Sequence, residues 1–305
     1  MNLGLFFGRR ATQTAAVACA LAVAPTAQAD LLDEIRARKH MVLAHRDASI
    51  PFSYVDGQGR VMGYSIDLCH RLVEAVRVHL ALPTLDVKYL PVTSSTRITA
   101  IAQRQADLEC GSTTNNAERR KLVDYTVAHF VSSSRLVVRK SSGVTALTDL
   151  AGQKVVSTKG STNLKTLKRL NAEQALRLDI LEAEGHAEGF AMVADGRAAA
   201  FAMDDVLLYG LIATSDKPGD YAVVGKVMSI EPYAIVLPKD EPAFKKLIND
   251  TMRKVILDRE IYPLYQRWFE SPIPPRGTNL RLPMPFFLRD SFKYPSDRVD
   301  DWYKD

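Results

Sequence analysis

The hydrophobic pattern from residue 31 to residue 111 alternates between short apolar runs and stretches with helical periodicity. Residues 31–39 predict a short amphipathic helix, and residues 41–45 and 85–90 predict buried strands. A helix between these strands is indicated by apolar side chains with a 3.6-residue period at Leu68, Leu72, Val73, Val76 and Leu80. A further helix and a strand follow over residues 97–105 and 107–111. This β-α-β-α-β order predicts a parallel sheet with helices on its faces.

The same pattern restarts near residue 134. Strands are predicted over residues 135–139, 154–158, 180–183 and 198–203. Helices are predicted over residues 164–170 and 186–195. We therefore expect an α/β protein of two lobes, each with a mainly parallel sheet and flanking helices.

The two lobes are expected to be discontinuous along the chain, because the last helical stretch, residues 244–268, follows a segment that returns from the second lobe. Lobe 1 is predicted from residues 30–134 and 232–272, and lobe 2 from residues 135–231. Crossing segments near residues 130–136 and 228–234 would form a two-segment hinge. Residues 273–305 form a proline-punctuated tail that is expected to wrap or trail as extended chain.

The first 29 residues have the pattern of a signal peptide. A basic start at Arg9 and Arg10 precedes a small apolar core over residues 14–24, which is too short for a stable membrane anchor. The residues Ala27-Gln-Ala29 have the A-x-A spacing of a cleavage site, so we expect cleavage after Ala29 and export to the periplasm. The rival interpretations are a lipidated Cys19, which lacks the preceding large aliphatic residue, and a twin-arginine signal, which the following residues do not fit.

Composition narrows the class of partner. The formal charge of +5 for 305 residues falls to +3 without the leader, which holds two arginines and no acidic residue. A mild basic excess without a Lys/Arg block argues against nucleic-acid binding. Beyond the leader only Cys69 and Cys110 remain, and the sequence leaves open whether they pair. No Cys/His metal spacing occurs, so we expect no metal or cofactor.

The most distinctive polar cluster runs from Glu109 to Arg119 and reads Glu-Cys-Gly-Ser-Thr-Thr-Asn-Asn-Ala-Glu-Arg. Hydroxyls and the N–H groups of a helix N-terminus favour an anion, and an arginine one or two turns away offers a bidentate fork. The cluster, Arg46 and the turn at residues 94–97 each follow a predicted strand. Because ligands on such sheets bind at the carboxyl ends of strands, we expect a carboxylate site there.

At this point the sequence resembles the periplasmic solute-binding proteins of ABC importers for polar amino acids, most closely their glutamate/aspartate-binding branch. The similarity covers nearly all of residues 40–275 in order. The matching strings are His45-Arg46, Pro51-Phe-Ser-Tyr54, Gly63-Tyr-Ser-Ile-Asp67, Thr93-Ser94 with Arg97, Glu109-Cys-Gly-Ser-Thr-Thr-Asn-Asn116 with Glu118-Arg119, Gly160-Ser-Thr162, His186 with Phe190, Gly196-Arg197, Met203-Asp-Asp-Val206 and Trp268-Phe-x-x-Pro272-Ile-Pro-Pro275.

The resemblance implies a bilobal clamp that closes over one amino acid. Arg119 resembles the arginine that grips the ligand α-carboxylate, with help from Ser112 and Thr114, and Asp204 resembles the carboxylate that receives the α-ammonium. A second cationic set for a side-chain carboxylate, with further hydroxyl donors, is implied at Arg46, Arg97, His186, Ser94, Thr158, Ser161 and Thr162. Ser161 departs from the threonine usual in such proteins, which affects affinity more than ligand class.

A count of charges supports an acidic ligand independently of the resemblance. Three arginines and a protonatable histidine stand against one or two aspartates, with Asp205 left as the rival of Asp204 or as a helix cap. A second carboxylate on the ligand suits this surplus, as in L-glutamate or L-aspartate. Buried cations without an anion would cost several kcal/mol each, so closure should depend on ligand. The two ligands differ by one methylene, about 0.8 kcal/mol of burial, which the residues leave unresolved.

We therefore expect a monomeric extracytoplasmic binding protein that delivers its ligand to the membrane permease of an ABC importer. One alternative is a dehydratase-like cleft enzyme on the same fold. Such an enzyme needs a general acid or base at the reacting bond, whereas each candidate here already has an electrostatic role. The other alternative is an amino-acid sensor acting in trans. The sequence favours a binding protein without enzymatic activity.

Overall fold

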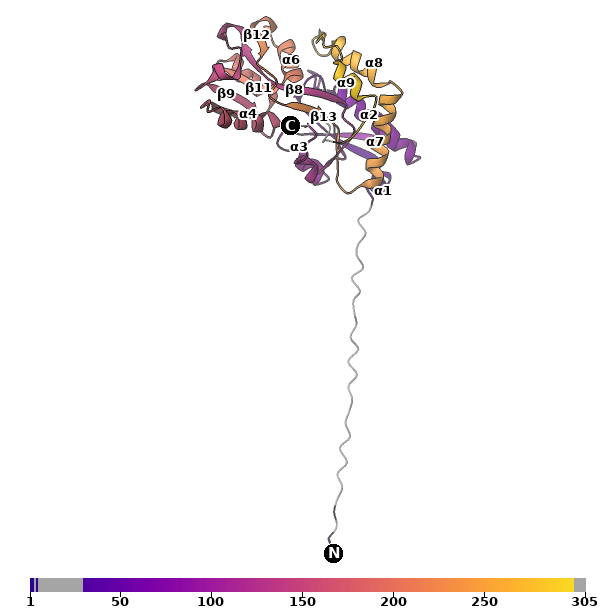
Figure 1. Cartoon of the computed structure of the whole chain (residues 1–305). Coiled ribbons are helices and arrows are strands. Elements are labelled where there is room, and N and C mark those ends of the chain that lie inside the picture. Colours follow the sequence, from indigo (N-terminus) through magenta and orange to yellow (C-terminus); the bar gives the residue numbers. More distant parts are fainter. Residues whose placement is uncertain (3, 5–29, 299–305) are drawn as a thin grey trace.

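The structure is a computed structural model that describes residues 1–2, 4 and 30–298. The expected signal peptide lies outside the described residues except for residues 1, 2 and 4, and so does the part of the tail at residues 299–305. Figure 1 shows two α/β lobes with the paired strands β8 (Phe130–Arg139) and β13 (Ile230–Tyr233) between them. The α/β two-lobe fold expected from the sequence is confirmed.

Lobe 1 is built on a five-stranded sheet in the order β5-β1-β6-β14-β7. Its strands are β1 (His40–His45), β5 (Asp86–Pro91), β6 (Leu108–Glu109), β7 (Asp124–Tyr125) and β14 (Val236–Leu237). A small three-stranded sheet adds β2 (Ala48–Ser49), β3 (Ser53–Val55) and β4 (Val61–Met62). The helices are α1 (Leu31–Arg38), α2 (Tyr64–His79), α3 (Arg97–Ala102), α7 (Pro242–Leu257) and α8 (Ile261–Tyr265), followed by a π-helical turn at Gln266–Glu270.

Lobe 2 is built on a six-stranded sheet in the order β10-β9-β11-β8-β12, with β13 paired to β8. Its other strands are β9 (Lys154–Thr158), β10 (Asp179–Ala183), β11 (Ala200–Asp204) and β12 (Tyr221–Val224). Its helices are α4 (Thr162–Glu173), α5 (His186–Ala194) and α6 (Asp205–Thr214).

Both sheets are mainly parallel, as expected, and each contains one strand that runs in the opposite direction. The strands β5, β1 and β6 are parallel in lobe 1, as are β10, β9 and β11 in lobe 2. The reversed strands are β14 in lobe 1, which is antiparallel to β6 and β7, and β8 in lobe 2, which is antiparallel to β11, β12 and β13. They belong to the chain that enters and leaves lobe 2, so their direction follows from the two crossings between the lobes. The β-α-β units predicted from periodicity are the parallel parts.

Local sequence explains why the helices form where they do. Asp30 caps α1, since its carboxylate accepts from the backbone N–H of Leu32 at 2.9 Å. In α2 the apolar positions with helical spacing are buried, including Leu68, Leu72 and Val76 at 0% exposure. They pack into the core of the lobe and face α7.

The tail is more ordered than the sequence indicated. Strands β15 (Pro272–Ile273) and β16 (Thr278–Asn279) pair, and helix α9 (Phe286–Ser291) follows. Leu288 and Phe292 are buried in the core of lobe 1. The helix was missed because the prolines around it favour extended chain, whereas the uninterrupted run from Phe286 onward supports a short helix.

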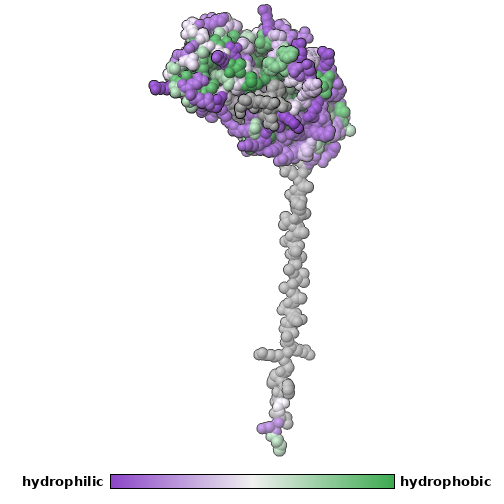
Figure 2. All heavy atoms as spheres, viewed as in Figure 1, coloured by the Kyte–Doolittle hydropathy of each residue, from purple (hydrophilic) through white to green (hydrophobic). Residues whose placement is uncertain are grey.

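Hydrophobic residues remain exposed on this tail, chiefly Phe286, Phe287 and Tyr294. On the face drawn in Figure 2, hydrophobic residues are interspersed with hydrophilic ones. No helix among the described residues is both long enough and apolar enough to cross a membrane.

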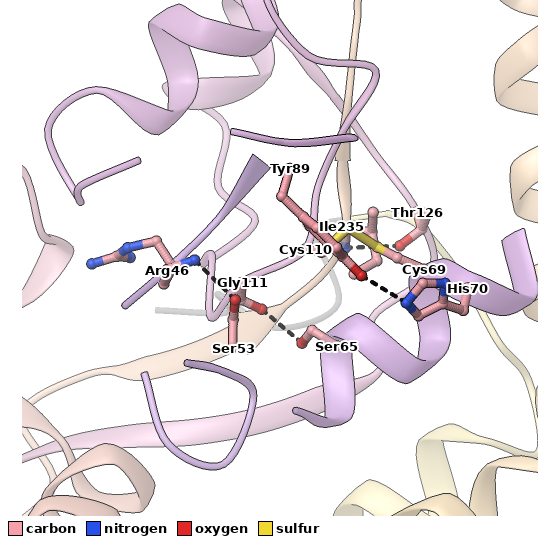
Figure 3. The surroundings of a disulfide bond; sticks show 10 residues. All are labelled: Arg46, Ser53, Ser65, Cys69, His70, Tyr89, Cys110, Gly111, Thr126 and Ile235. Atoms are coloured by element: carbon pink, nitrogen blue, oxygen red, sulfur yellow. Dashed lines mark hydrogen bonds between the residues drawn. A yellow bond between two sulfur atoms is a disulfide. The ribbon is translucent and has the colours of Figure 1, made fainter. Parts of the chain in front are cut away.

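Cys69 of α2 and Cys110 after β6 form a disulfide, which resolves the question that the sequence left open. Both cysteines are fully buried. Figure 3 shows the bond between α2 and the strand end, beside a hydrogen bond in which the Ser65 hydroxyl donates to the carbonyl of Gly111 at 2.8 Å. The side chain of Arg46 points away from the disulfide in this view. The polar segment after β6 is therefore tied to α2 by one covalent and one hydrogen bond.

Replacing both cysteines with alanine is expected to lower the free energy of unfolding by about 4 kcal/mol in the chain-entropy description of cross-links. The bond joins residues 41 positions apart, so its loss frees a long loop in the unfolded chain. Urea unfolding of the oxidised chain, the double variant and the reduced chain would measure this difference. The double variant and the reduced chain should agree, and an unchanged free energy of unfolding would show that the disulfide contributes nothing.

Candidate ligand-binding site

The sequence-predicted site residues gather at the strand ends of the two lobes. In lobe 1, Arg46 follows β1, Ser94 and Arg97 follow β5, and Ser112 and Thr114 follow β6. The lobe 2 residues stand at the ends of β9 and β11 and at the starts of α4 and α5, namely Thr158, Ser161, Thr162, His186 and Asp204. Hydrogen bonds from Arg46 to His186 and from Arg119 to Gly160 join the two groups across the lobes, so the expected convergence occurs in space.

Arg46 connects the lobes directly. Its Nη2 donates to the hydroxyl of Ser94 at 2.8 Å and lies 3.3 Å from Nε2 of His186. The backbone N–H of Arg46 donates to Ser53, which fixes the base of the side chain. Burial lowers the pKa of this guanidinium, and the carboxylate of Glu109 opposes that shift. Its Nη1 is buried and has no hydrogen-bond partner among the described residues.

Arg97 is a second buried cation on the same side. Its Nη1 donates to the carbonyl of Ser112 at 3.1 Å and to the hydroxyl of Thr113 at 2.7 Å. Burial, followed by the positive charges of Arg119 and Arg46, lowers the pKa of Arg97 to about 9. Within the part of the chain that the structure describes, its Nε and the hydroxyl of Ser112 are buried without a partner. The three arginines therefore form one electropositive cluster that favours an anion.

A glycine is required beside this cluster. A Cβ on Gly111 would lie 2.2 Å from Oε1 of Glu109 and 3.0 Å from Cγ of Arg46. The buried carboxylate and the arginine stem occupy the space that any other side chain would need. A second close approach occurs between the lobes at Gly160, where a Cβ would lie 2.6 Å from Cα of Ser95.

Arg119 reaches across to lobe 2 from a shorter element than expected. It opens a three-residue 3₁₀ turn, Arg119–Lys121, rather than an α-helix, so there is no helix N-terminus to hold an anion. Its Nη1 donates to the carbonyl of Thr114 at 2.9 Å and its Nη2 to the carbonyl of Gly160 at 3.3 Å. Of the two anion-binding features that the sequence predicted here, only the guanidinium is present.

His186 is neutral rather than cationic, which changes its expected role. Burial and the charges of Arg46 and Arg97 hold its pKa well below the usual range. Because an arginine only donates, Nε2 facing Arg46 is the acceptor, and Nδ1 carries the proton. That proton points at the hydroxyl of Thr158, 2.9 Å away.

Ser161 has a local structural function in addition to its predicted one. Its hydroxyl donates to the carbonyl of Thr158 at 2.6 Å and accepts from the backbone N–H of Leu164 at 3.1 Å, as the N-cap of α4. The Ser161 hydroxyl therefore uses its only proton in a hydrogen bond inside lobe 2.

Asp204 and Asp205 occupy different environments. The carboxylate of Asp205 is held by the hydroxyls of Ser132 and Ser133 on β8, so it secures α6 to the crossing strand. The carboxylate of Asp204 is 3% exposed and accepts from the amide of Asn163 at 3.2 Å. Burial, and then the negative charge of Glu231, raise the pKa of Asp204 to about 7. The geometry favours Asp204 as the carboxylate that faces the site.

Three polar residues near the site were missed by sequence reasoning. Thr113 lies inside the string Glu109–Asn116 and Asn163 directly follows Gly160-Ser-Thr162, so both are next to residues with predicted roles, and that position was a usable signal. Glu231 is 2% exposed and accepts from the hydroxyls of Thr114 and Thr162, both at 2.7 Å. It lies on the returning strand β13, where nothing in the local pattern marks it.

No group of three His, Cys, Asp or Glu side chains suited to a metal ion occurs among residues 1–2, 4 and 30–298. Surface cavities occur away from the cluster of arginines. One of about 610 Å³ lies near Arg104 and Glu241, and one of about 270 Å³ lies between the crossing strands and the tail, near Val131 and Leu282.

Comparison with known proteins identifies the family. Residues 41–271 match the family model described as bacterial extracellular solute-binding proteins, family 3. The L-glutamate/L-aspartate-binding protein of Pseudomonas aeruginosa is 42% identical over 93% of this chain and 95% of its own length. The glutamate/aspartate import solute-binding protein of Escherichia coli K12 is 40% identical over 95% of this chain and 98% of its own.

A solved structure of the solute receptor for L-cysteine of Neisseria gonorrhoeae shares the fold, with a TM-score of 0.69. That comparison covers 79% of this chain and 93% of the receptor at 20% identity. Family model, sequence relatives and fold agree, and the chain belongs to the bacterial extracellular solute-binding proteins, family 3.

Proposed function

We propose that this chain binds L-glutamate or L-aspartate between its two lobes and delivers the amino acid to the permease of an ABC importer. The proposal draws on the names of the relatives at 40–42% identity, which are glutamate/aspartate-binding or import proteins. It also draws on the chemistry of the cluster itself.

The observation that carries the proposal is the set of buried donors without acceptors. At the arginine cluster these include Nη1 of Arg46, Nε of Arg97 and the hydroxyl of Ser112. Leaving two guanidinium N–H groups buried and unpaired is unfavourable, so a ligand rich in carboxylate oxygens suits them. A zwitterion with a neutral side chain offers one carboxylate, whereas glutamate and aspartate offer two.

The roles of the residues follow from position and charge. Arg119 and Ser112 bind the α-carboxylate, and Asp204 receives the α-ammonium. Arg46 and Arg97 bind the side-chain carboxylate, with Ser94 orienting Arg46. His186 and Thr158 hold Arg46 from lobe 2, and Ser161, Thr162 and Thr114 order the surrounding backbone and hydroxyls.

The clamp itself is proposed to divide at the crossing strands. Lobe 1 comprises residues 30–134 and 232–272, lobe 2 comprises residues 135–231, and the paired strands β8 and β13 act as the hinge. Because the carboxylate of Glu109 only partly offsets the burial and mutual repulsion of the arginines, an anionic ligand is expected to stabilise the closed form and shift the population towards it.

We further propose that the chain is exported through a cleavable leader ending at Ala29 and acts as a monomer in the periplasm. Its partners are the amino acid and the membrane subunits of the importer. No cofactor takes part in this function.

Calorimetric titration of the chain, expressed with its own leader and stripped of ligand by unfolding and refolding, tests the proposal. L-glutamate, L-aspartate, L-glutamine and L-arginine would be compared. Tight binding of either acid with a weak response to glutamine is the expected result. A preference for glutamine or arginine would show that Arg46 and Arg97 do not bind a second carboxylate. Recovery of the amino acid unchanged after incubation would further distinguish binding from dehydratase-like chemistry.

A further inference from the structure

Glu231 has a position that the proposed ligand contacts do not explain. It lies on β13, one of the two strands that cross between the lobes, opposite Ser132 of β8. Its side chain is 2% exposed and turns towards both lobes. A carboxylate is costly to bury unless its oxygens are paired, so its partners indicate what it does.

Three hydroxyls pair with this carboxylate. Oε2 accepts from Thr114 of lobe 1 and from Thr162 of lobe 2, each at 2.7 Å. Oε1 accepts from Ser229, which lies two residues away on the same segment. One oxygen thus joins the two lobes, and the other is held by the crossing segment itself.

The hydroxyls of Thr114 and Thr162 have only one proton each to give. Once each threonine has donated its proton to Glu231, its hydroxyl oxygen can only accept hydrogen bonds. The two threonine oxygens, 3.4 Å apart, therefore do not hydrogen-bond to each other. Thr114 therefore does not donate to an α-carboxylate, which the sequence reading had expected. An oxygen of this kind suits a positively charged donor such as an ammonium group.

We propose that Glu231 is a positioning residue: by accepting both threonine protons it fastens the closed lobes and presents Thr114 and Thr162 as acceptors for the ligand ammonium. The inference rests on the proposed function, because it requires an amino acid in the cleft. Glu231 does not contact the ligand itself. It acts through the two threonines and through Asp204, whose carboxylate interacts electrostatically with it.

The second consequence concerns pH. Asp204 is faced by Glu231 from β13, by Asn163 from α4, by Asp205 from its own helix and by Tyr233. Burial and then Glu231 raise the pKa of Asp204 to about 7. The ligand ammonium binds the ionised form of the Asp204 carboxylate. The affinity for the amino acid is therefore highest above pH 7 and falls as the pH drops through 7. A single group of that pKa weakens binding about tenfold between pH 8 and pH 6.

Two variants test the two halves of the proposal. Thr162→Val removes the bond from lobe 2 while keeping the shape, and should weaken glutamate binding roughly tenfold or more, mainly through faster dissociation.

Glu231→Gln keeps an acceptor oxygen but removes the charge, so the pKa of Asp204 falls. Burial, the larger cause of the raised pKa, remains in that variant, so its glutamate affinity should still fall on acidification but at a lower pH than in the unaltered chain. Ser229→Ala, which alters only the other oxygen's partner, is the matched control and should keep the pH profile.

Stopped-flow dissociation rates and titrations at three pH values would measure these effects. Equal affinity in Thr162→Val and the unaltered chain, or a pH profile in Glu231→Gln that is not shifted from that of the unaltered chain, would overturn the role of Glu231 while leaving the proposed function intact. If the unaltered chain itself bound neither acid, the proposed function would fail instead. Thermal unfolding of each variant confirms that the comparison concerns folded protein.

Discussion

An Arg119→Met chain is expected to lose affinity for glutamate by about 30-fold to several thousand-fold, the range for truncating one partner of a desolvated charge pair. The guanidinium reaches across the cleft and already donates to carbonyls of both lobes, at Thr114 and Gly160. Its remaining N–H donors would offer a fork to an α-carboxylate. Calorimetric titration with glutamate measures the loss.

The neighbouring residue provides a matched control. Arg120 donates to the side chain of Asn115 at 2.8 Å and to the carbonyl of Asp297 in the tail, away from the arginine cluster. An Arg120→Met chain should therefore bind glutamate normally even if its unfolding temperature falls. If both variants bound equally well, Arg119 would be a structural arginine, and the α-carboxylate would have to be assigned to other donors.

Periodicity was sufficient for the fold because the relevant signals are local. Strand β9 spans the predicted residues 154–158, and α2 buries the predicted apolar face. The reversed direction of β8 and β14 and the helix α9 were not predicted, since they depend on how the chain returns between the lobes and how the tail packs. Local propensity carries no information on that route.

The site residues were identifiable by type but not by protonation or pairing. An arginine after a strand predicts a cation at the sheet edge, and Arg46 and Arg97 lie there. That His186 is neutral follows from burial beside two arginines, which arises only after folding. Glu231 was missed for the same reason, because its importance comes from two hydroxyls more than 65 positions away in the sequence.

The second large effect is expected at Arg97. An Arg97→Met chain should bind glutamate about a hundredfold or more weakly, whereas its weak binding of glutamine should change much less. The reason is that the Arg97 Nε has no acceptor among the described residues, and that burial, followed by the positive charges of Arg119 and Arg46, lowers the pKa of Arg97 to about 9. A second carboxylate relieves that repulsion and an amide does not, so the ratio of glutamate to glutamine affinity is the quantity to measure.

Arg104 supplies the comparison, because it belongs to the same segment but pairs with Glu34 and Glu241 on the far side of lobe 1. Arg104→Met should lower stability and leave the affinity ratio unchanged. Arg97→Lys keeps the charge but not the planar fork that joins Ser112 and Thr113, so it should recover only part of the ratio. A ratio that stayed constant across Arg97→Met and Arg97→Lys would mean that discrimination between acid and amide resides in Arg46 alone.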